Sequence, residues 1–241
     1  MLSFGFMKTV NAIPYVANSV TFDGTNDYLN RGADLSSNAD SKLVTGSCWV
    51  RFAGLTSATQ RLWYSAGEAF AINWNTTEEI VVRAENSGGT TILNVNSSTI
   101  AGQVWHHVMF SFDLANAANR HLYMDEVSDL TVTTYTDDTI DFTVSDHGMG
   151  ATPLGANKFA GEIADLQLYF GVYTDLSNAA NRAKFISSGL PVDPAIAVAT
   201  FGTPTVLFAG DTSTWHTNQG DGGGFTENGA LTDGTNEPVE L

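Results

Sequence analysis

Four aromatic side chains stand at positions where a sugar ring could stack on them. Trp63 and Tyr64 are adjacent, Trp74 follows in the next apolar run, and Trp215 lies in a polar segment near the end of the chain. Glycan sites combine such an aromatic platform with nearby amide and carboxylate groups. We therefore take Trp63, Tyr64, Trp74 and Trp215 as candidate carbohydrate-binding residues. The competing interpretation is core packing, the commoner role of an aromatic residue in a β-sandwich.

Paired carboxylates on one strand would indicate glycoside hydrolysis, because the acid and the nucleophile must face the same cleft. Glu162 and Asp165 have the wrong spacing, since on a regular strand they point to opposite faces. Asp137, Asp138 and Asp141 fall in a turn-rich segment that lacks a glutamate. The sequence therefore offers no suitable pair, and we predict a protein that is not an enzyme.

Histidine and cysteine give no better chemistry. His106 and His107 are adjacent, so on a strand they project in opposite directions and cannot share a metal ion. The single cysteine, Cys48, alternates with Val50 and Phe52, which predicts a small core residue rather than a nucleophile. One cysteine also excludes a disulfide within the chain.

The 241-residue chain is acidic, with 10 Lys and Arg against 26 Asp and Glu and a formal charge of −16. The negative electrostatic potential of such a chain repels phosphate backbones and anionic membranes, so we expect no nucleic-acid partner. No run has the length of a transmembrane helix, and the start lacks the pattern of a secretory signal. We expect a protein made in the cytoplasm, without a signal peptide and without membrane insertion.

Short apolar runs separated by polar and glycine-rich turns recur from Ser19 onward, which favours an antiparallel two-sheet β-sandwich. One helix is expected after Asp175 or Ser177, ended by Gly189 and Pro191. The expected strands include residues 70–74, 80–83, 90–95, 105–113, 131–135, 140–144 and 161–169.

Two octets, Asp113–Arg120 and Asp175–Arg182, differ at one position. Their flanking residues share nothing, and the first is expected to join two strands while the second opens a helix. We interpret the match as a coincidence of turn and cap chemistry rather than as a structural repeat.

Three segments carry a family resemblance. They are Phe22–Leu29 (F-D-G-T-N-D-Y-L), Trp105–Asp113 followed by His121–Asp125 (W-H-H-V-M-F-S-F-D and H-L-Y-M-D), and Gly161–Tyr169 (G-E-I-A-D-L-Q-L-Y). In this order they resemble the laminin-G-like, concanavalin A-like jelly roll. The resemblance implies an all-β fold, an antiparallel two-sheet jelly-roll β-sandwich, here with one short helix and a C-terminal β-rich appendage. Lectins, receptors, glucanases and virion proteins share this fold, so it does not fix the function.

The resemblance also implies a metal ion. Jelly rolls of this class often hold calcium at a rim through carboxylate and carbonyl oxygens. Asp23, Asp27 and Asp165 match family positions, which makes them the candidate calcium ligands and calcium the one cofactor to consider. The alternative is that these aspartates accept hydrogen bonds from turn amides.

The glycine-rich segment at residues 218–231 (N-Q-G-D-G-G-G-F-T-E-N-G-A-L) resembles the ending of laminin-G-like structural proteins of tailed bacteriophages and prophages. We therefore predict a non-enzymatic bacteriophage virion protein, in a head decoration, tail fibre or baseplate. Its expected partners are other virion proteins, and host-surface glycans are candidate ligands. The alternative is a bacterial carbohydrate-binding module.

Composition divides the chain into an N-terminal arm (1–15), the jelly-roll domain (16–191) and a C-terminal β-rich extension (192–241). The two terminal segments hold apolar residues that a jelly roll standing alone would leave poorly covered, among them Phe4, Phe6, Ile13, Phe201, Phe208 and Trp215. Such segments cover their own sheet or a neighbouring subunit. We predict a homo-oligomer, expected as a trimer, held together by the termini, and a core that folds without them.

Overall fold

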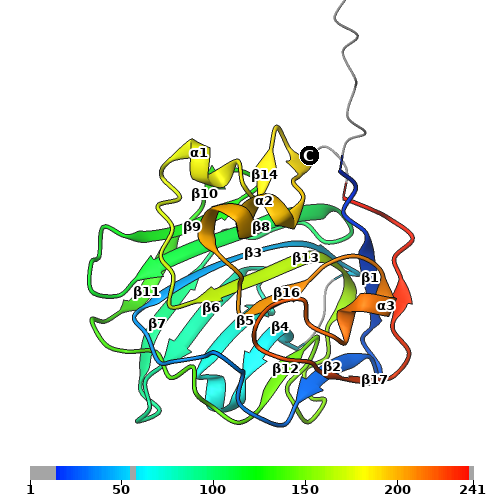
Figure 1. The fold of residues 1–241 in the computed structure, drawn as a ribbon, viewed down its shortest axis with the longest axis horizontal. Helices are drawn as coiled ribbons and strands as arrows, with labels where there is room; N and C mark the ends of the chain where they lie inside the picture. Colours follow the sequence, from blue (N-terminus) through cyan, green and yellow to red (C-terminus); the bar gives the residue numbers. More distant parts are fainter. Residues whose placement is uncertain (1–14, 55–57, 239–241) are drawn as a thin grey trace, which may run out of the picture.

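Two antiparallel β-sheets pack face to face in the computed structural model, which describes residues 15–54 and 58–238 (Figure 1). Sheet A has the order β10-β9-β8-β3-β13-β1-β18, with β16 also paired to β13. Its strands are β1 (Ser19–Asp23), β3 (Leu43–Phe52), β8 (Trp105–Asp113), β9 (Arg120–Met124), β10 (Val127–Ser128), β13 (Ala160–Phe170), β16 (Val206–Phe208) and β18 (Thr232–Asp233).

Sheet B has the order β11-β7-β6-β5-β4-β12-β2-β17. Its strands are β2 (Tyr28–Arg31), β4 (Gln60–Ser65), β5 (Phe70–Trp74), β6 (Ile80–Glu85), β7 (Thr91–Asn96), β11 (Thr131–Tyr135), β12 (His147–Met149) and β17 (Thr226–Asn228). A hairpin of β14 (Ile186–Ser187) and β15 (Leu190–Pro191), the helices α1 (Ala179–Arg182), α2 (Pro194–Phe201) and α3 (Thr212–Trp215), and the 3₁₀ turn η1 (Ala66–Glu68) complete the described fold. The predicted all-β jelly-roll sandwich is confirmed.

Side-chain alternation assigns the two faces of each strand. In β3, Cys48, Val50 and Phe52 point between the sheets, whereas Trp49 points to the outer face of sheet A. The space between the sheets is filled by large apolar side chains, and the rings of Phe52 and Trp74 lie 3.9 Å apart there. Burial of this apolar surface is the main force that holds the two sheets together.

The outer face of sheet A is covered by a second apolar layer, drawn from the segment that follows β13 (Figure 1). Trp49 and Tyr169 of the sheet pack there with Phe185, Ile186 and Ala197. Aromatic stacking contributes, since the rings of Phe185 and Phe201 lie 5.6 Å apart. The outer face of sheet B has no such apolar layer among the described residues, which leaves that face for polar groups.

The single helix expected after residue 175 is replaced by two shorter ones. α1 has four residues and begins at Asn178, whose side chain accepts a hydrogen bond from Ala180 N. The chain then turns into the β14–β15 hairpin, because Ser188 (φ 55°) and Gly189 (φ 73°) adopt the left-handed conformations of a tight turn. The unpredicted α2 begins with Pro194 at its first position and is capped by Asp193, so Pro194 marks a helix start, whereas Pro191 lies in β15.

The segment after residue 191 is not a separate appendage, which corrects the predicted organisation. β16 pairs with β13, β18 pairs with β1, and β17 pairs with β2, so the segment contributes strands to both sheets. Phe208 and Trp215 are 0% exposed and belong to the core between the sheets. These side chains therefore need no second subunit to cover them, and the strand pairs lead us to expect loss of the fold when the segment after residue 191 is deleted.

The N-terminal arm of the prediction, with Phe4, Phe6 and Ile13, lies outside the described residues except for Tyr15. Tyr15 packs against the apolar layer on sheet A. Among the described residues, no helix has both the length and the apolar character needed to cross a membrane.

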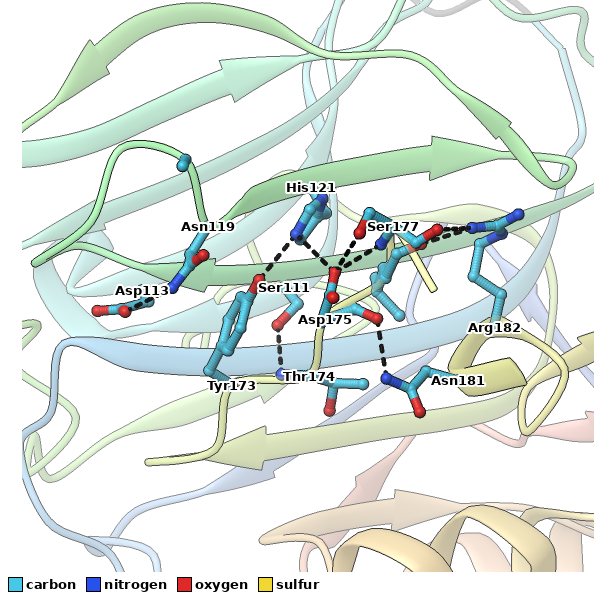
Figure 2. Close-up of polar contacts among 12 residues, drawn as sticks. Ser111, Asp113, Asn119, His121, Tyr173, Thr174, Asp175, Ser177, Asn181 and Arg182 are labelled. Atoms are coloured by element: carbon cyan, nitrogen blue, oxygen red, sulfur yellow. Dashed lines mark hydrogen bonds and ion pairs between the residues drawn. The ribbon is translucent and has the colours of Figure 1, made fainter. Parts of the chain in front are cut away.

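The two similar octets begin with the same turn and lie near each other (Figure 2), but the second half of the first leads into β9 and that of the second forms α1. In each, the first Asp accepts a hydrogen bond from the N–H two residues later, and the central Asn does the same. His121, which follows the first octet, has its Nε2 2.9 Å from Tyr173 Oη and 3.6 Å from Asp175 of the second. The shared turn chemistry thus gives similar turns at the start of both octets, whereas the last four residues form a helix in the second octet alone.

Candidate functional site

The outer face of sheet B carries a row of polar side chains across four neighbouring strands. The strand register places Arg61 of β4 opposite Asn73 of β5, and Arg83 of β6 opposite Asn94 of β7. These residues alternate with core residues, so all four point away from the space between the sheets. We call this surface the polar face. It presents guanidinium and amide groups, which are the hydrogen-bonding groups of a binding site for polar ligands.

An ion-pair network joins the two arginines of the polar face. Arg61 Nη2 donates to Glu68 Oε1 at 2.6 Å, and Arg83 Nη2 donates to Glu85 Oε1 at 2.7 Å. Arg83 also pairs with Glu68, so the Glu68 carboxylate lies between the two guanidinium groups. Gly67 (φ 71°) and Glu68 (φ 64°) both have left-handed backbone conformations. This conformation is energetically unfavourable for a glutamate, and here it places the Glu68 carboxylate in its ion pairs with the two arginines.

Two buried polar atoms of the polar face have no hydrogen-bond partner in the described structure. They are Nε of Arg61, a residue 9% exposed, and Oδ1 of Asn73, a residue 5% exposed. Burial lowers the pKa of Arg61 from its ordinary value, yet a guanidinium remains protonated. Buried donors and acceptors are nearly always satisfied by protein or by an ordered molecule. Both atoms are covered by neighbouring protein atoms, so an enclosed water, rather than a ligand from solution, would be the partner that satisfies them.

A cavity of about 330 Å³ opens beside the polar face at Tyr64. The Arg61 guanidinium carbon lies 4.9 Å from the centre of the Tyr64 ring, so the ring connects the arginine to the cavity. In the sheet register the neighbours of Tyr64 are Ala71, which has only a methyl side chain, and Gly148, which has none, so neither covers the Tyr64 ring. The other lining residues are Ala66, Gly67, Asp146, Thr152, Pro153 and Leu154.

Of the four predicted carbohydrate-binding residues, only Tyr64 lies at this surface. Trp63 and Trp215 are 0% exposed and Trp74 is 1% exposed, and all three belong to the core between the sheets. Their rings pack on other aromatic rings, as Trp215 does on Phe208 at 5.6 Å. A buried ring cannot stack on a sugar, so the predicted tryptophan platform is wrong and core packing is the correct interpretation.

The three predicted calcium ligands do not assemble. Asp23 and Asp27 lie together, but Asp23 pairs with Ala160 of β13, five residues before Asp165, or roughly 16 Å along the strand. Among the described residues, no group of three or more carboxylate, histidine or cysteine side chains could hold a metal ion. A calcium site built from all three aspartates is therefore not supported.

The turn at Asp23 uses its carboxylates for backbone hydrogen bonds. Asp23 Oδ1 accepts from the N–H groups of Thr25 (2.7 Å), Asn26 (2.9 Å) and Asp27 (3.2 Å). Slight burial works to raise the pKa of Asp23, but these backbone donors outweigh it and hold the pKa below its ordinary value. Asp27 in turn accepts from Asp23 N and from Ala230 N. Turn chemistry therefore explains both residues.

Asp165 is buried at a β-bulge in β13, between Ala164 and Gln167. The extra residue, with φ 48°, turns Asp165 to the outer side of sheet A, where Tyr15 Oη donates to both carboxylate oxygens at 2.9 and 3.0 Å. Glu162 points to the same side, where it pairs with Arg51 at 3.3 Å. The expected opposite orientation of Glu162 and Asp165 is thus wrong, but both are at most 4% exposed and neither lines a described cavity.

The adjacent histidines have separate environments. His106 Nδ1 lies 2.7 Å from Asp125 Oδ2; burial acts to lower the pKa of His106, but the carboxylate outweighs it and raises that pKa. His107 is 0% exposed with its Nε2 2.9 Å from Ser47 Oγ, and burial lowers its pKa to about 3. His107 is therefore a neutral core residue.

Sequence reasoning missed Arg61, Asn73, Arg83 and Asn94. The available signal was alternation, since Asn73 lies between Ile72 and Trp74, and Arg83 between Val82 and Ala84. Polar residues at outward positions of neighbouring strands predict a polar surface. Their convergence depends on strand order and register, which the sequence pattern does not specify.

Comparison with known proteins agrees with this architecture. The Laminin_G_3 family model, described as "Concanavalin A-like lectin/glucanases superfamily", matches residues 23–176, more than half of the chain. No curated protein sequence matches the chain.

Two solved structures have a similar fold at 11% sequence identity. One is a heptameric SAP-like pentraxin from Limulus polyphemus, with a TM-score of 0.58 over 92% of this chain and 97% of that one. The other is a "putative carbohydrate binding protein" from Bacteroides ovatus, with a TM-score of 0.65 over 95% of this chain and 63% of that one. Such low identity shows the fold alone. The family match and the two-sheet architecture together place this chain in the concanavalin A-like lectin/glucanase superfamily.

Proposed function

We propose that this protein binds carbohydrate on the polar face of sheet B, with Tyr64 as the aromatic contact. The observation that carries the proposal is the cavity of about 330 Å³ with Tyr64 in its wall, where the Arg61 guanidinium packs on the Tyr64 ring. Sugars present both an apolar ring face and many hydroxyl groups, so they match a site that combines an aromatic ring with polar groups. The lectin-like family supports the proposal, although fold alone does not assign a ligand.

A glycan array with the wild-type protein and the Tyr64→Ala variant tests this proposal. Loss of the ring should weaken binding by about tenfold or more, because aromatic contacts of this kind contribute on the order of 1 kcal/mol beyond their buried area. Tyr173→Ala is the matched control, since it also removes a tyrosine ring and Tyr173, between β13 and α1, contacts His121 of sheet A and does not line the cavity. Absence of binding to any glycan, or binding that Tyr64→Ala leaves unchanged, would refute the proposal.

We propose further that the bound glycan is not hydrolysed. Glu68 and Glu85 are the carboxylates of the polar face, and both are paired with arginine. A guanidinium partner stabilises the ionised form, whereas glycoside hydrolysis needs one protonated carboxylic acid. Release of reducing ends from any bound glycan, abolished by Glu68→Gln or Glu85→Gln, would overturn this part of the proposal.

We propose a bacteriophage particle as the place where this binding acts. Support comes from the glycine-rich segment at residues 218–231, which resembles phage structural proteins and which folds here into the loop before β17 and into β17 itself. Mass spectrometry of purified particles, with the copy number per particle, tests the assignment. The protein should be present at a fixed copy number. Its absence from washed particles would favour the alternative, a free bacterial carbohydrate-binding module.

Assembly as a homo-oligomer stays part of the proposal, but we no longer expect the C-terminal segment to form the contacts between subunits. Residues 192–238 are built into the two sheets, so they do not remain available as an exchanged arm. Light scattering of the full-length protein gives the oligomeric state directly, and a mass of about one subunit would refute assembly in solution.

A further inference from the structure

The Tyr64 cavity has apolar lining residues besides the aromatic ring. Pro153 and Leu154 line it, and Leu154 is 94% exposed. An isolated exposed leucine is unremarkable by itself. This one differs because it stands at the mouth of a cavity with an aromatic wall, where a bound ligand would cover it.

The loop that carries Leu154 is fixed in place. Gly148 of β12 lies beside Tyr64 in the sheet, and a Cβ at Gly148 would come within 2.4 Å of Ala151 O, so the glycine lets the loop pack directly on the strand. Thr152 N donates to Ala156 O at 2.9 Å, and Thr152 Oγ1 accepts from Ala156 N at 2.9 Å. A rim fixed in this way loses little conformational entropy when a ligand binds.

The charged side chain among the described lining residues is Asp146. Its backbone carbonyl is held by Ala66 N at 2.9 Å, which keeps the residue next to η1. Its carboxylate accepts a hydrogen bond from Ser145 Oγ at 3.4 Å, a length at which the bond is weak. The carboxylate therefore retains the capacity to accept a ligand N–H or O–H, and it disfavours an anionic ligand.

We propose that the Tyr64 cavity selects sugars that carry an acetamido group, a specificity that rests on the proposed carbohydrate binding. The sugar ring would contact Tyr64, the amide N–H would donate to the Asp146 carboxylate, and the methyl group would cover Leu154. A hydroxyl in place of the acetamido group leaves Leu154 uncovered. A sugar carboxylate or sulfate in the cavity meets the negative charge of Asp146, within a chain of net charge −16.

Matched oligosaccharides test the specificity by titration calorimetry. The probes are the β-1,4-linked trisaccharides of N-acetylglucosamine and of glucose, with N-acetylgalactosamine and galactose as a second pair. We expect the acetamido member of at least one pair to bind roughly tenfold more tightly, for one covered methyl group and one charge-assisted hydrogen bond. Leu154→Ser and Asp146→Asn should each reduce this preference to about threefold or less.

The controls separate this inference from the proposed function. Val127→Ser changes another exposed apolar residue, 66% exposed on β10 of the other sheet, and should leave the preference unchanged. Glycan binding that depends on Tyr64 but shows no acetamido preference overturns the specificity and leaves carbohydrate binding intact. A preference that survives both Leu154→Ser and Asp146→Asn also overturns it. Absence of binding to every glycan overturns the proposed function itself.

Discussion

Replacement of Asp165 by asparagine should change how the stability of this protein depends on pH. Asp165 is 3% exposed, and Tyr15 Oη is the hydrogen-bond donor to its carboxylate. Burial raises the pKa of Asp165 to about 7; the Tyr15 hydrogen bond opposes this rise, and Asp193 and Glu237 add to it. The unfolded chain has the ordinary value of 3.8.

The direction and the size of the change in stability with pH follow from the difference between the folded and unfolded pKa values of Asp165. Above pH 4 the unfolded chain gives up its proton while the folded carboxyl keeps it, so ionisation favours unfolding as the pH rises. The contribution of protonated Asp165 to the free energy of unfolding is fully present below about pH 4 and is lost progressively up to about pH 7. A shift of about 3 pH units at ~1.4 kcal/mol each gives a loss of about 4 kcal/mol, a large share of the ~5–15 kcal/mol of a typical domain.

Urea unfolding followed by tryptophan fluorescence, at intervals from pH 4 to pH 9, measures the effect. Asp165→Asn is neutral at every pH, so the variant should be less stable than the wild type near pH 4, where its amide lacks a matched partner, and more stable near pH 8. His107 and His147 give the opposite trend in both proteins, because burial lowers their pKa values to about 3 and about 4. The informative quantity is therefore the difference between variant and wild type.

Asp221→Asn is the matched control, since Asp221 is exposed and should leave the profile unchanged. Parallel profiles for the wild type and Asp165→Asn would refute the reasoning, because they would mean that Asp165 titrates equally in the folded and unfolded chains. Crossing profiles with a difference that develops between pH 4 and 7 would support it.

Three further outcomes are expected. Truncation after Pro191 should abolish the cooperative thermal transition seen by circular dichroism, because it removes β16–β18 and the buried Trp215; a folded truncated core would contradict the strand pairing. Gly161→Ala should lower the free energy of unfolding, measured in urea, by about 3 kcal/mol or more. The reason is that Gly161 has φ 151° and the new Cβ would lie 2.1 Å from Arg51 O. Near-wild-type stability would show instead that β3 and β13 can separate locally at little energetic cost. Addition of calcium or of a chelator should change the melting temperature by less than about 1 °C, because the Asp23 and Asp27 carboxylates already accept backbone hydrogen bonds. A rise of several degrees with calcium would support a calcium site after all.

Alternation in the sequence was sufficient to predict the sandwich, because a strand with one face in the core must repeat with a period of two. Cys48, Val50 and Phe52 were placed correctly in the core by this rule. The role of residues 192–238 was not predictable in the same way. Their strands have two or three residues, too short for a periodic pattern, and they are recognisable only from their partners in the sheets.

A β-bulge in β4 is the reason why sequence reasoning predicted part of the candidate site incorrectly. Regular alternation along β4 would place Arg61 and Trp63 on one face, and sequence reasoning offered both Trp63 and its neighbour Tyr64 as sugar contacts. The register instead shifts between Arg61 and Trp63, so that Trp63 pairs opposite Ile72 in the core and Tyr64 turns outward beside Arg61. The same device in β13 turns Asp165 to the side of Glu162. A bulge adds one residue without changing composition or periodicity over the rest of the strand, so only the pairing of neighbouring strands reveals which side chains it redirects. In this protein that one residue decides that Tyr64, and not Trp63, lies on the outer face of sheet B.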